Sequence, residues 1–275
     1  MTTKSNLFAP LAALLVSLAL PTGSAAQARQ PEPGLADMAA LSLSAATILR
    51  AEITRTTEVR PDRAPGLAPG YRRLFVRADV RGVVAAAGPV EREIRYLVDV
   101  PETARGRAPR LKGADMLLFL GPEQRPGEYA LAHKYGQQAW SAQRESTARR
   151  IAEESARESG LSFAPAAIES AFHVTGTLPG ESESQIFVRT AADARLSLVV
   201  LRRPGTAPLV NVATGDFIDP NAPPPQQGTL PVIALACSLP ERLPDDAVME
   251  PRVATQLRTD YQAALAALGG CDRNF

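Results

Sequence analysis

Residue types and motifs that mark catalytic centres are scarce in this sequence. Its 275 residues include two histidines, two cysteines and one tryptophan. The motifs G-x-S-x-G, S-x-x-K, H-E-x-x-H, G-x-G-x-x-G and G-x-x-x-x-G-K are all absent. The hydrolase and nucleotide-dependent activities that these motifs mark therefore lose support.

The two cysteines, Cys237 and Cys271, do not form a C-x-x-C motif. A thioredoxin-like redox function is therefore not supported. In an oxidising compartment the simplest interpretation is one disulfide, and closing its loop would stabilise the fold by roughly 3 to 4 kcal/mol. Two buried free thiols are the alternative.

Long apolar runs are also absent, apart from one near the amino terminus. Lys4 precedes the apolar run Leu7–Leu20, and Ala26–Ala28 supplies a small-residue cleavage pattern. The run spans about 14 residues, fewer than the roughly 20 that a membrane-crossing helix needs, and it contains Pro10. We therefore expect residues 1–28 to be a cleaved signal peptide, although a retained anchor is the alternative. The expected location is the periplasm, with no membrane span after cleavage.

The remaining chain predicts an α+β protein with two modules. A lead-in at 29–45 precedes a first module at 46–160, which ends in a bridging helix near 141–158. Alternating or continuous apolar residues predict strands in this module near 49–54, 74–80, 94–100, 116–120 and 129–133. These strands favour an antiparallel β-meander or a small OB-like barrel.

The second module, 161–275, is predicted to be smaller and also α+β. Ile168 and Phe172, four residues apart, indicate a short helix after Pro165. Strands are expected at 185–190, 196–203 and 209–213. Val253, Leu257, Tyr261, Leu265 and Leu268 form one stripe of a C-terminal helix that ends at Gly269. We expect an extended loop at 220–228.

Charge is distributed unevenly between the modules. Residues 50–112 contain 13 arginines and one lysine against eight acidic residues. The expected basic face comprises Arg73, Arg77, Arg81, Arg92 and Arg95. One interpretation is that these arginines cover ordinary solvated strand faces, or that opposite charges on the two modules attract each other. The other interpretation is a site for an anionic partner. Because few aromatic residues interleave with it, nucleic acid is not an expected partner.

Candidate acid–base or metal-binding residues are dispersed. His133 and His173 lie 40 residues apart, which is not a recognised ligand spacing. Two acidic clusters, Glu181 with Glu183 and Asp216 with Asp219, are compatible with paired carboxylate chemistry or with solvated turns. No catalytic residue, metal or cofactor is predicted, and Trp140 is expected to anchor the start of the bridging helix by packing.

Four segments carry a resemblance. They are RLKG at 110–113, GESESQIF at 180–187, RRPG at 202–205 and LACSLP at 235–240. They resemble an uncharacterised group of exported, periplasmic proteins of high-GC Gram-negative bacteria, over most of the chain after the leader. The first module is also similar in outline to OB-like barrels of the netrin and tissue-inhibitor type. The first resemblance implies no known activity, whereas the second implies binding.

The sequence thus favours a non-enzymatic binding or envelope-accessory protein, with an anionic envelope component or a protein as its partner. The alternative is a periplasmic hydrolase or transferase without a recognisable motif, which would use loop carboxylates or a histidine.

Overall fold

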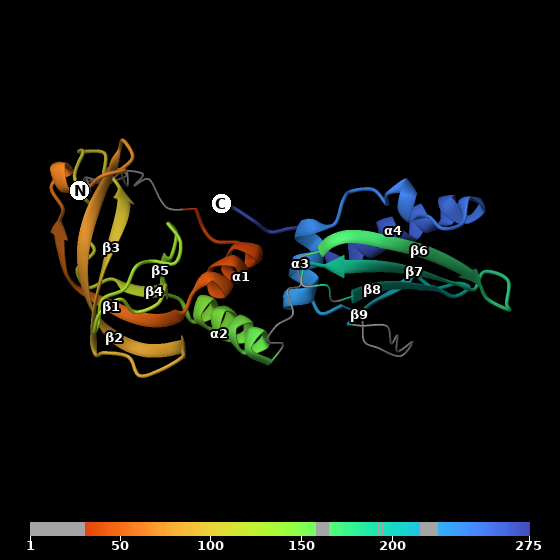
Figure 1. Cartoon of the computed structure of the whole chain (residues 1–275), viewed down its shortest axis with the longest axis horizontal. Coiled ribbons are helices and arrows are strands. Elements are labelled where there is room, and N and C mark those ends of the chain that lie inside the picture. The colour runs from red at the N-terminus through yellow and green to blue at the C-terminus, as the bar shows by residue number, and fades with distance from the viewer. Residues whose placement is uncertain (1–30, 158–164, 192, 194, 215–224) are drawn as a thin grey trace, which may run out of the picture.

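Two antiparallel sheets with helices between them form the described part of the chain (Figure 1). The computed structural model describes residues 31–157, 165–191, 193, 195–214 and 225–275. The predicted signal peptide and the pair Asp216 and Asp219 lie outside these residues. The predicted α+β class, with an N-terminal sheet and a C-terminal module of sheet and helix, is confirmed.

The elements of the first half are α1 (Leu35–Ser44), β1 (Thr47–Glu58), η1 (Pro61–Arg63), β2 (Tyr71–Ala86), β3 (Glu93–Pro101), β4 (Asp115–Leu120), β5 (Gln137–Ala139) and α2 (Ala142–Arg157). Those of the second half are β6 (Pro165–Thr175), β7 (Ser182–Thr190), β8 (Arg195–Arg202), β9 (Leu209–Thr214), α3 (Leu230–Ser238), η2 (Asp245–Ala247), η3 (Pro251–Val253) and α4 (Ala254–Leu268).

The first sheet curls into a partly open barrel. Its strand order is β3-β2-β1-β4-β5, and all of these pairs are antiparallel. Arg95 of β3 forms a parallel bridge with Glu128, and Leu131 bridges Leu120 of β4, so residues 128–131 connect the edge strand β3 to the end of β4. This closing contact gives a five-stranded sheet the shape of a small barrel.

The position predicted for the fifth strand is wrong. Residues 129–133 make a single bridge to β4, while the strand itself forms at Gln137–Ala139. The buried hydroxyl of Tyr96 donates a hydrogen bond of 2.8 Å to Gln137 and fixes β5 against the barrel interior. This contact between distant residues has no local sequence signal.

Strand β4 is buried on both faces because it separates two cores. Met116, Leu118 and Leu120 belong to the barrel core, whereas Leu117 and Phe119 belong to a second core. A continuous apolar run is the pattern expected for a strand without a solvated face. The predicted buried strand at 116–120 is therefore confirmed, and it is buried because each of its faces packs into a separate core.

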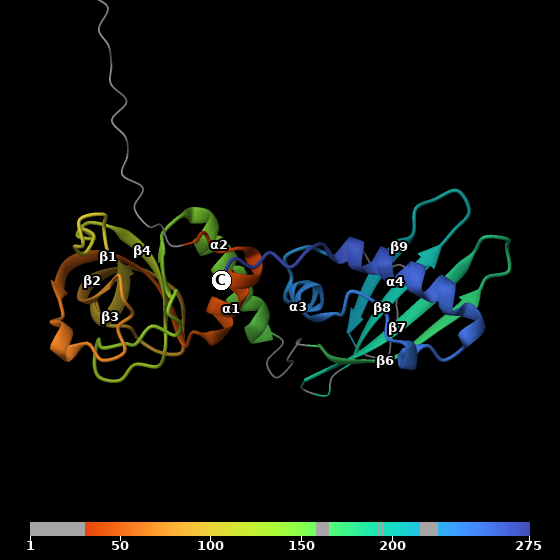
Figure 2. The same ribbon diagram turned by 90° about the horizontal axis from the view of Figure 1, so that it is seen from above.

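The second sheet has the order β6-β7-β8-β9, and α4 lies along one of its faces (Figure 2). The helix predicted after Pro165 is wrong, because this segment is strand β6. Ile168 pairs with Val188 and Phe172 with Gln185 of β7. The buried Ala171 and the exposed Phe172 follow the period of two typical of a strand, and pairing with β7 satisfies the backbone groups on the β7 side of this edge strand.

Helices α1, α2 and α3 fill the space between the sheets (Figures 1 and 2). Their apolar residues form one continuous core with the second sheet and with Leu117 and Phe119 of the barrel. The predicted disulfide is present, and it joins Cys237 of α3 to Cys271 beyond α4. None of the helices in the described ranges is long and apolar enough to cross a membrane.

Residues 271–275, the tail segment, lie against the lead-in to α1. Ala36 N–H donates to the carbonyl of Asp272 at 3.0 Å, and Asn274 N–H donates to the buried Asp37 carboxylate at 2.7 Å. Gly34 permits this approach, because a Cβ there would lie 2.2 Å from the Asp272 carbonyl oxygen. The two ends of the described chain are therefore joined beside the barrel.

Candidate ligand-binding pocket and outer face of the barrel

The five predicted arginines all project from β2, β3 or the turn between them, but carboxylates engage three of them. Arg73 forms a two-pronged pair with Asp99, with contacts of 2.7 and 2.8 Å. Arg81 pairs with Glu52 at 2.8 Å, and Arg95 approaches Glu128 at 3.5 Å. Arg77 and Arg92 are exposed, and neither has an ion-pair partner among the described residues.

Strand register adds one arginine that the sequence analysis did not include. Arg55 of β1 and Arg95 of β3 both lie directly opposite Arg77 of β2, forming an arginine row across three strands. Like charges placed directly opposite each other in a sheet are destabilising. On one side of the arginine row, Glu52, Asp79 and Glu93 form an acidic row. On the other side lie Thr57, Phe75 and Leu97, called the apolar row after the two large side chains of Phe75 and Leu97.

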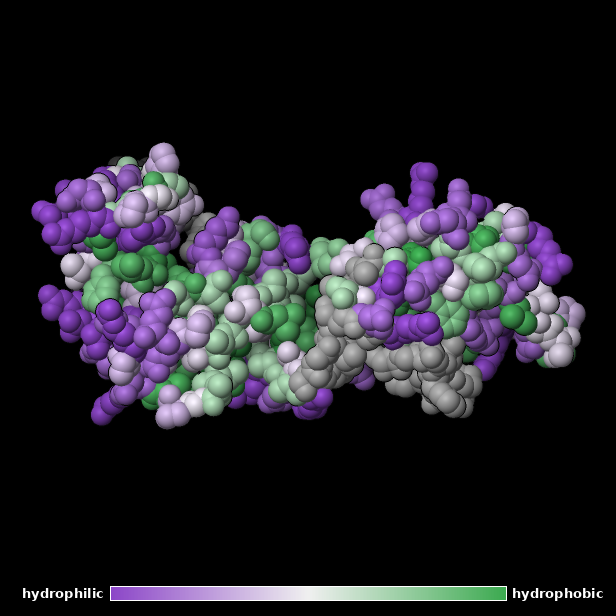
Figure 3. Space-filling model, viewed as in Figure 1, coloured by the Kyte–Doolittle hydropathy of each residue, from purple (hydrophilic) through white to green (hydrophobic). Residues whose placement is uncertain are grey.

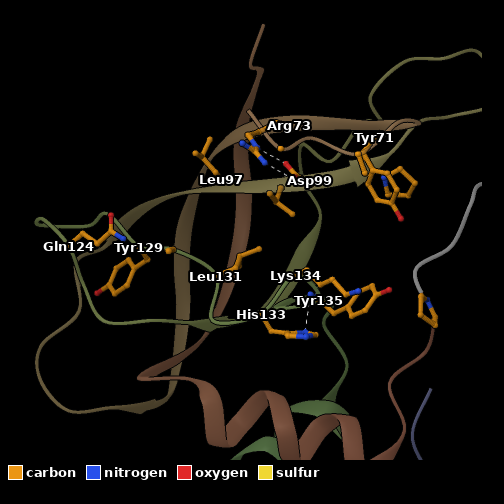
Figure 4. A pocket seen from close by; sticks show the side chains of 16 residues that line it. Tyr71, Arg73, Leu97, Asp99, Gln124, Tyr129, Leu131, His133, Lys134 and Tyr135 are labelled. Atoms are coloured by element: carbon orange, nitrogen blue, oxygen red, sulfur yellow. Dashed lines mark hydrogen bonds and ion pairs between the residues drawn. The ribbon is translucent and has the colours of Figure 1, made fainter. Parts of the chain in front are cut away.

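A large cavity lies at the other end of the same face. This barrel pocket has a volume of about 650 Å³, within the range of roughly 300–1,000 Å³ typical of ligand sites. It forms where β3 and the segment after Glu128 diverge, and the loop before β2 supplies a further wall (Figure 4). Its lining includes Ala68, Tyr71, Arg73, Leu97, Asp99, Gln124, Tyr129, Ala130, Leu131, His133, Lys134 and Tyr135.

The walls of the pocket combine apolar surfaces with hydrogen-bonding groups. Tyr71 is 40% exposed and Leu97 is 48% exposed, so both present apolar surface to solvent. The bidentate contact with Asp99 raises the pKa of Arg73 and leaves the pair without net charge. Burial, followed by the nearby carboxylates of Glu123 and Glu91, raises the pKa of Tyr129 and keeps its hydroxyl protonated.

One end of the barrel pocket is formed by aromatic side chains and a lysine. The ring of Tyr135 lies 4.2 Å, centre to centre, from that of Phe275 in the tail segment, and His133 stacks on Phe275 at 5.9 Å. Lys134 Nζ lies 4.9 Å from the Tyr135 ring centre and has no carboxylate partner in the described structure. Pro31 of the lead-in also lines the pocket.

The histidines and loop carboxylates do not converge on one centre. His133 is in the barrel loop, whereas His173 is in β6 of the other module. Glu181 and Glu183 line a depression of about 330 Å³ together with Arg202 and Arg203. Glu183 accepts a hydrogen bond from Gln185 at 2.6 Å. Within the described ranges, no group of three or more His, Cys, Asp or Glu side chains is placed to hold a metal ion.

His173 instead joins a buried polar network. Its Nδ1 lies 2.9 Å from Ser184 Oγ, and Ser184 donates to Asp260 at 2.5 Å. Arg202 also donates to Asp260, at 2.5 Å. Ser184 is fully buried between His173 and the carboxylate, so it is not placed as a nucleophile activated by a histidine. The network holds α4 against the second sheet.

Sequence reasoning identified the arginines but missed the aromatic lining. The aromatic residues of the basic region were noted only for their small number, and Tyr129 was assigned only to a strand. His133 was assigned to the same strand and weighed as an acid–base or metal-binding residue, but not as part of a pocket. The available signal was the segment Leu131–Tyr135. It contains two aromatic rings and a lysine within five residues, and its apolar and polar residues do not alternate as in a strand. Comparison with known protein families and with curated proteins finds no match to this chain.

Proposed function

We propose that this protein is a non-catalytic binding protein, and that the barrel pocket with the adjoining outer face of β2 and β3 is its ligand site. The observation that carries the proposal is the pocket itself. Exposed aromatic and aliphatic side chains surround hydrogen-bond donors and acceptors at the place where β3 and the segment after Glu128 diverge. Figure 3 shows apolar surface enclosed by hydrophilic side chains on the barrel half of the molecule.

The chemistry of the lining supports binding over catalysis. A general acid or base, or a nucleophile, requires a proton-transfer partner within hydrogen-bonding reach. Asp99 is already held by both prongs of Arg73. His133 Nδ1 accepts a hydrogen bond from the backbone N–H of Tyr135 at 3.3 Å. Both oxygens of Asp99 are therefore occupied, and His133, whose Nε2 is open, has no carboxylate partner among the described residues to orient it for proton transfer.

We also propose that the protein acts in the periplasm. The leader pattern of residues 1–28 is typical of a cleaved export signal. The Cys237–Cys271 disulfide fits an oxidising compartment. Sequencing the amino terminus of protein purified from its native cell tests this proposal, and a retained Met1 in a cytosolic fraction would contradict it.

Blocking the pocket tests the proposed binding function. Ala130 is exposed on the pocket wall, so Ala130→Trp should fill the cavity without disturbing the barrel core. We expect an envelope extract of the native cell to shift the ring NMR signals of Tyr71 and Tyr135 in the wild-type protein. The shifts should fall at least tenfold in the variant.

Ala87→Trp provides the matched control, because Ala87 is also exposed but lies in the β2–β3 turn outside the pocket. This variant should retain the wild-type response. The bound component should be recovered chemically unchanged. Recovery of a cleaved or modified component would favour a hydrolase or transferase, and an unaltered response in Ala130→Trp would place the site elsewhere.

A further inference from the structure

We infer that the ligand of the barrel pocket is an acidic saccharide chain. Its sugar rings would lie in the pocket, and its acidic groups would extend to the arginine row. This inference rests on the proposed binding function and specifies the chemistry of its ligand. It follows from the order in which groups are arranged along the outward face of β2 and β3.

Four rows of side chains follow one another along this face. The Arg73–Asp99 pair at the pocket comes first, followed by the apolar row, the arginine row and the acidic row. Outward positions on a strand are spaced by roughly 7 Å, so roughly 13 Å separates the Arg73–Asp99 pair from the arginine row. This span exceeds a single sugar ring and requires a chain of linked rings.

The pocket end matches a sugar better than it matches a simple anion or a lipid. A sugar ring has an apolar face, and its hydroxyls both donate and accept hydrogen bonds. Tyr71 and Leu97 offer apolar surface, while Arg73 donates and Asp99 accepts. Because Asp99 neutralises Arg73, this pair is a poor receptor for an isolated anion. A lipid chain would need a continuous apolar wall, which the pair interrupts.

The arginine row supplies the preference for acidic groups. Arg55 and Arg77 lack ion-pair partners among the described residues, and they are held opposite each other at an electrostatic cost. A carboxylate or sulfate across the row would relieve this repulsion. The acidic row next to it would repel the same ligand, so the acidic portion should end at Arg77 and Arg95.

The test uses the full mature chain and three soluble probes of similar length. Oligogalacturonate carries rings and acidic groups, chitohexaose carries rings alone, and hexaglutamate carries acidic groups alone. Calorimetric titration at low salt should rank oligogalacturonate first, with the other two probes at least tenfold weaker. Added salt should weaken the binding of oligogalacturonate and leave that of chitohexaose unchanged.

Two variants assign the two ends of the site. Arg77→Gln should reduce oligogalacturonate affinity about tenfold without affecting chitohexaose, whereas Tyr71→Ala should weaken both saccharides. The matched controls are the exposed Arg242→Gln and Phe172→Ala in the other module, which should change neither. Phe172 is 42% exposed, close to the value for Tyr71. Circular dichroism spectra identical to wild type confirm that the variants are folded.

Each remaining outcome would overturn the inference. Equal binding of hexaglutamate and oligogalacturonate would mean that charge alone is recognised, and equal binding of chitohexaose would remove the arginine row from the site. If the envelope extract perturbs Tyr71 and Tyr135 but no saccharide does, the ligand class is wrong while the proposed function stands. If neither the extract nor any probe does so, both fail.

Discussion

At the residue scale, the structure separates arginines that are already paired from those that remain available. Arg73 and Arg81 are held by Asp99 and Glu52. Arg77 faces like charges on both neighbouring strands. Counting the arginines in the sequence treats these side chains as equivalent, although their electrostatic surroundings differ. The difference decides which arginine to mutate first.

Asp260 illustrates the same principle in the second module. It is fully buried and accepts hydrogen bonds from Ser184, Arg202 and Gln256. We expect Asp260→Ala to lower the free energy of unfolding by about 2 to 3 kcal/mol, because the buried hydroxyl of Ser184 and the partly exposed guanidinium of Arg202 lose their common partner. Urea unfolding measures the change, with Asp245→Ala on the exposed pair with Arg258 as the control. A loss below about 1 kcal/mol would show that Asp260 is not essential to the network.

At the element scale, side chains from β1 and the start of α2 fasten the bridging helix to the barrel. Trp140 donates its indole N–H to Glu145 at 2.7 Å, and Arg50 lies over the Trp140 ring at 3.7 Å. Arg50 is also paired with Asp115 of β4 at 2.7 Å. Trp140 was predicted to be a packing anchor, and these contacts show how it joins the helix to the sheet.

This contact should depend on pH. The hydrogen bond from Trp140, followed by the hydrogen bond from Arg149, lowers the pKa of Glu145 below its usual value. A carboxylate with a lowered pKa stabilises the fold above its unfolded-state pKa, and this contribution is lost as the pH falls through the folded-state pKa. We expect Trp140→Phe to cost about 1 to 2 kcal/mol at pH 7 and less at pH 3.

Urea unfolding of wild type and Trp140→Phe at both pH values measures this difference. Phenylalanine keeps an aromatic face beneath Arg50 but cannot donate to Glu145, so it isolates the hydrogen bond. Glu145→Gln should flatten the same pH dependence. An equal cost of Trp140→Phe at pH 7 and pH 3 would show that the hydrogen bond to Glu145 is not the cause.

At the scale of the whole molecule, the disulfide and the tail segment connect distant parts of the chain. Cys271 is bonded to Cys237, and the residues that follow it contact the lead-in and the rings of His133 and Tyr135. The covalent link therefore limits the freedom of a segment that packs beside the barrel pocket.

We expect the double variant Cys237→Ser, Cys271→Ser to lose roughly 3 to 4 kcal/mol of stability, as estimated from the entropy of closing this loop. The Tyr135 ring signal should also shift as its contact with Phe275 weakens. Chemical denaturation and NMR of the folded variant measure the two effects. Asp37→Ala, with the disulfide intact, should shift Tyr135 in the same direction by freeing Asn274. An unchanged Tyr135 signal in both variants would show that the tail segment is held independently of them.

Much of the fold was predictable because its signals are local. Alternation along 74–80 and 94–100 and the apolar stripe of the final helix reflect which side of an element is buried. Strand β6 was not predictable in this way, because Ile168 and Phe172 fit a helical spacing as well as a strand. Pairing with β7 decided the outcome, and that energy comes from residues distant in sequence.

The sequence by itself determined the α+β class, the cysteine pair and the outward direction of the arginines on β2 and β3. Only the tertiary structure brought Tyr71, Asp99 and Tyr135 to one pocket, aligned Arg55 with Arg77 and Arg95, and surrounded Asp260 with its donors. Burial patterns repeat along a single element and can be read from its residues. Strand register and loop packing depend on many weak contacts between distant segments, which the local pattern does not encode.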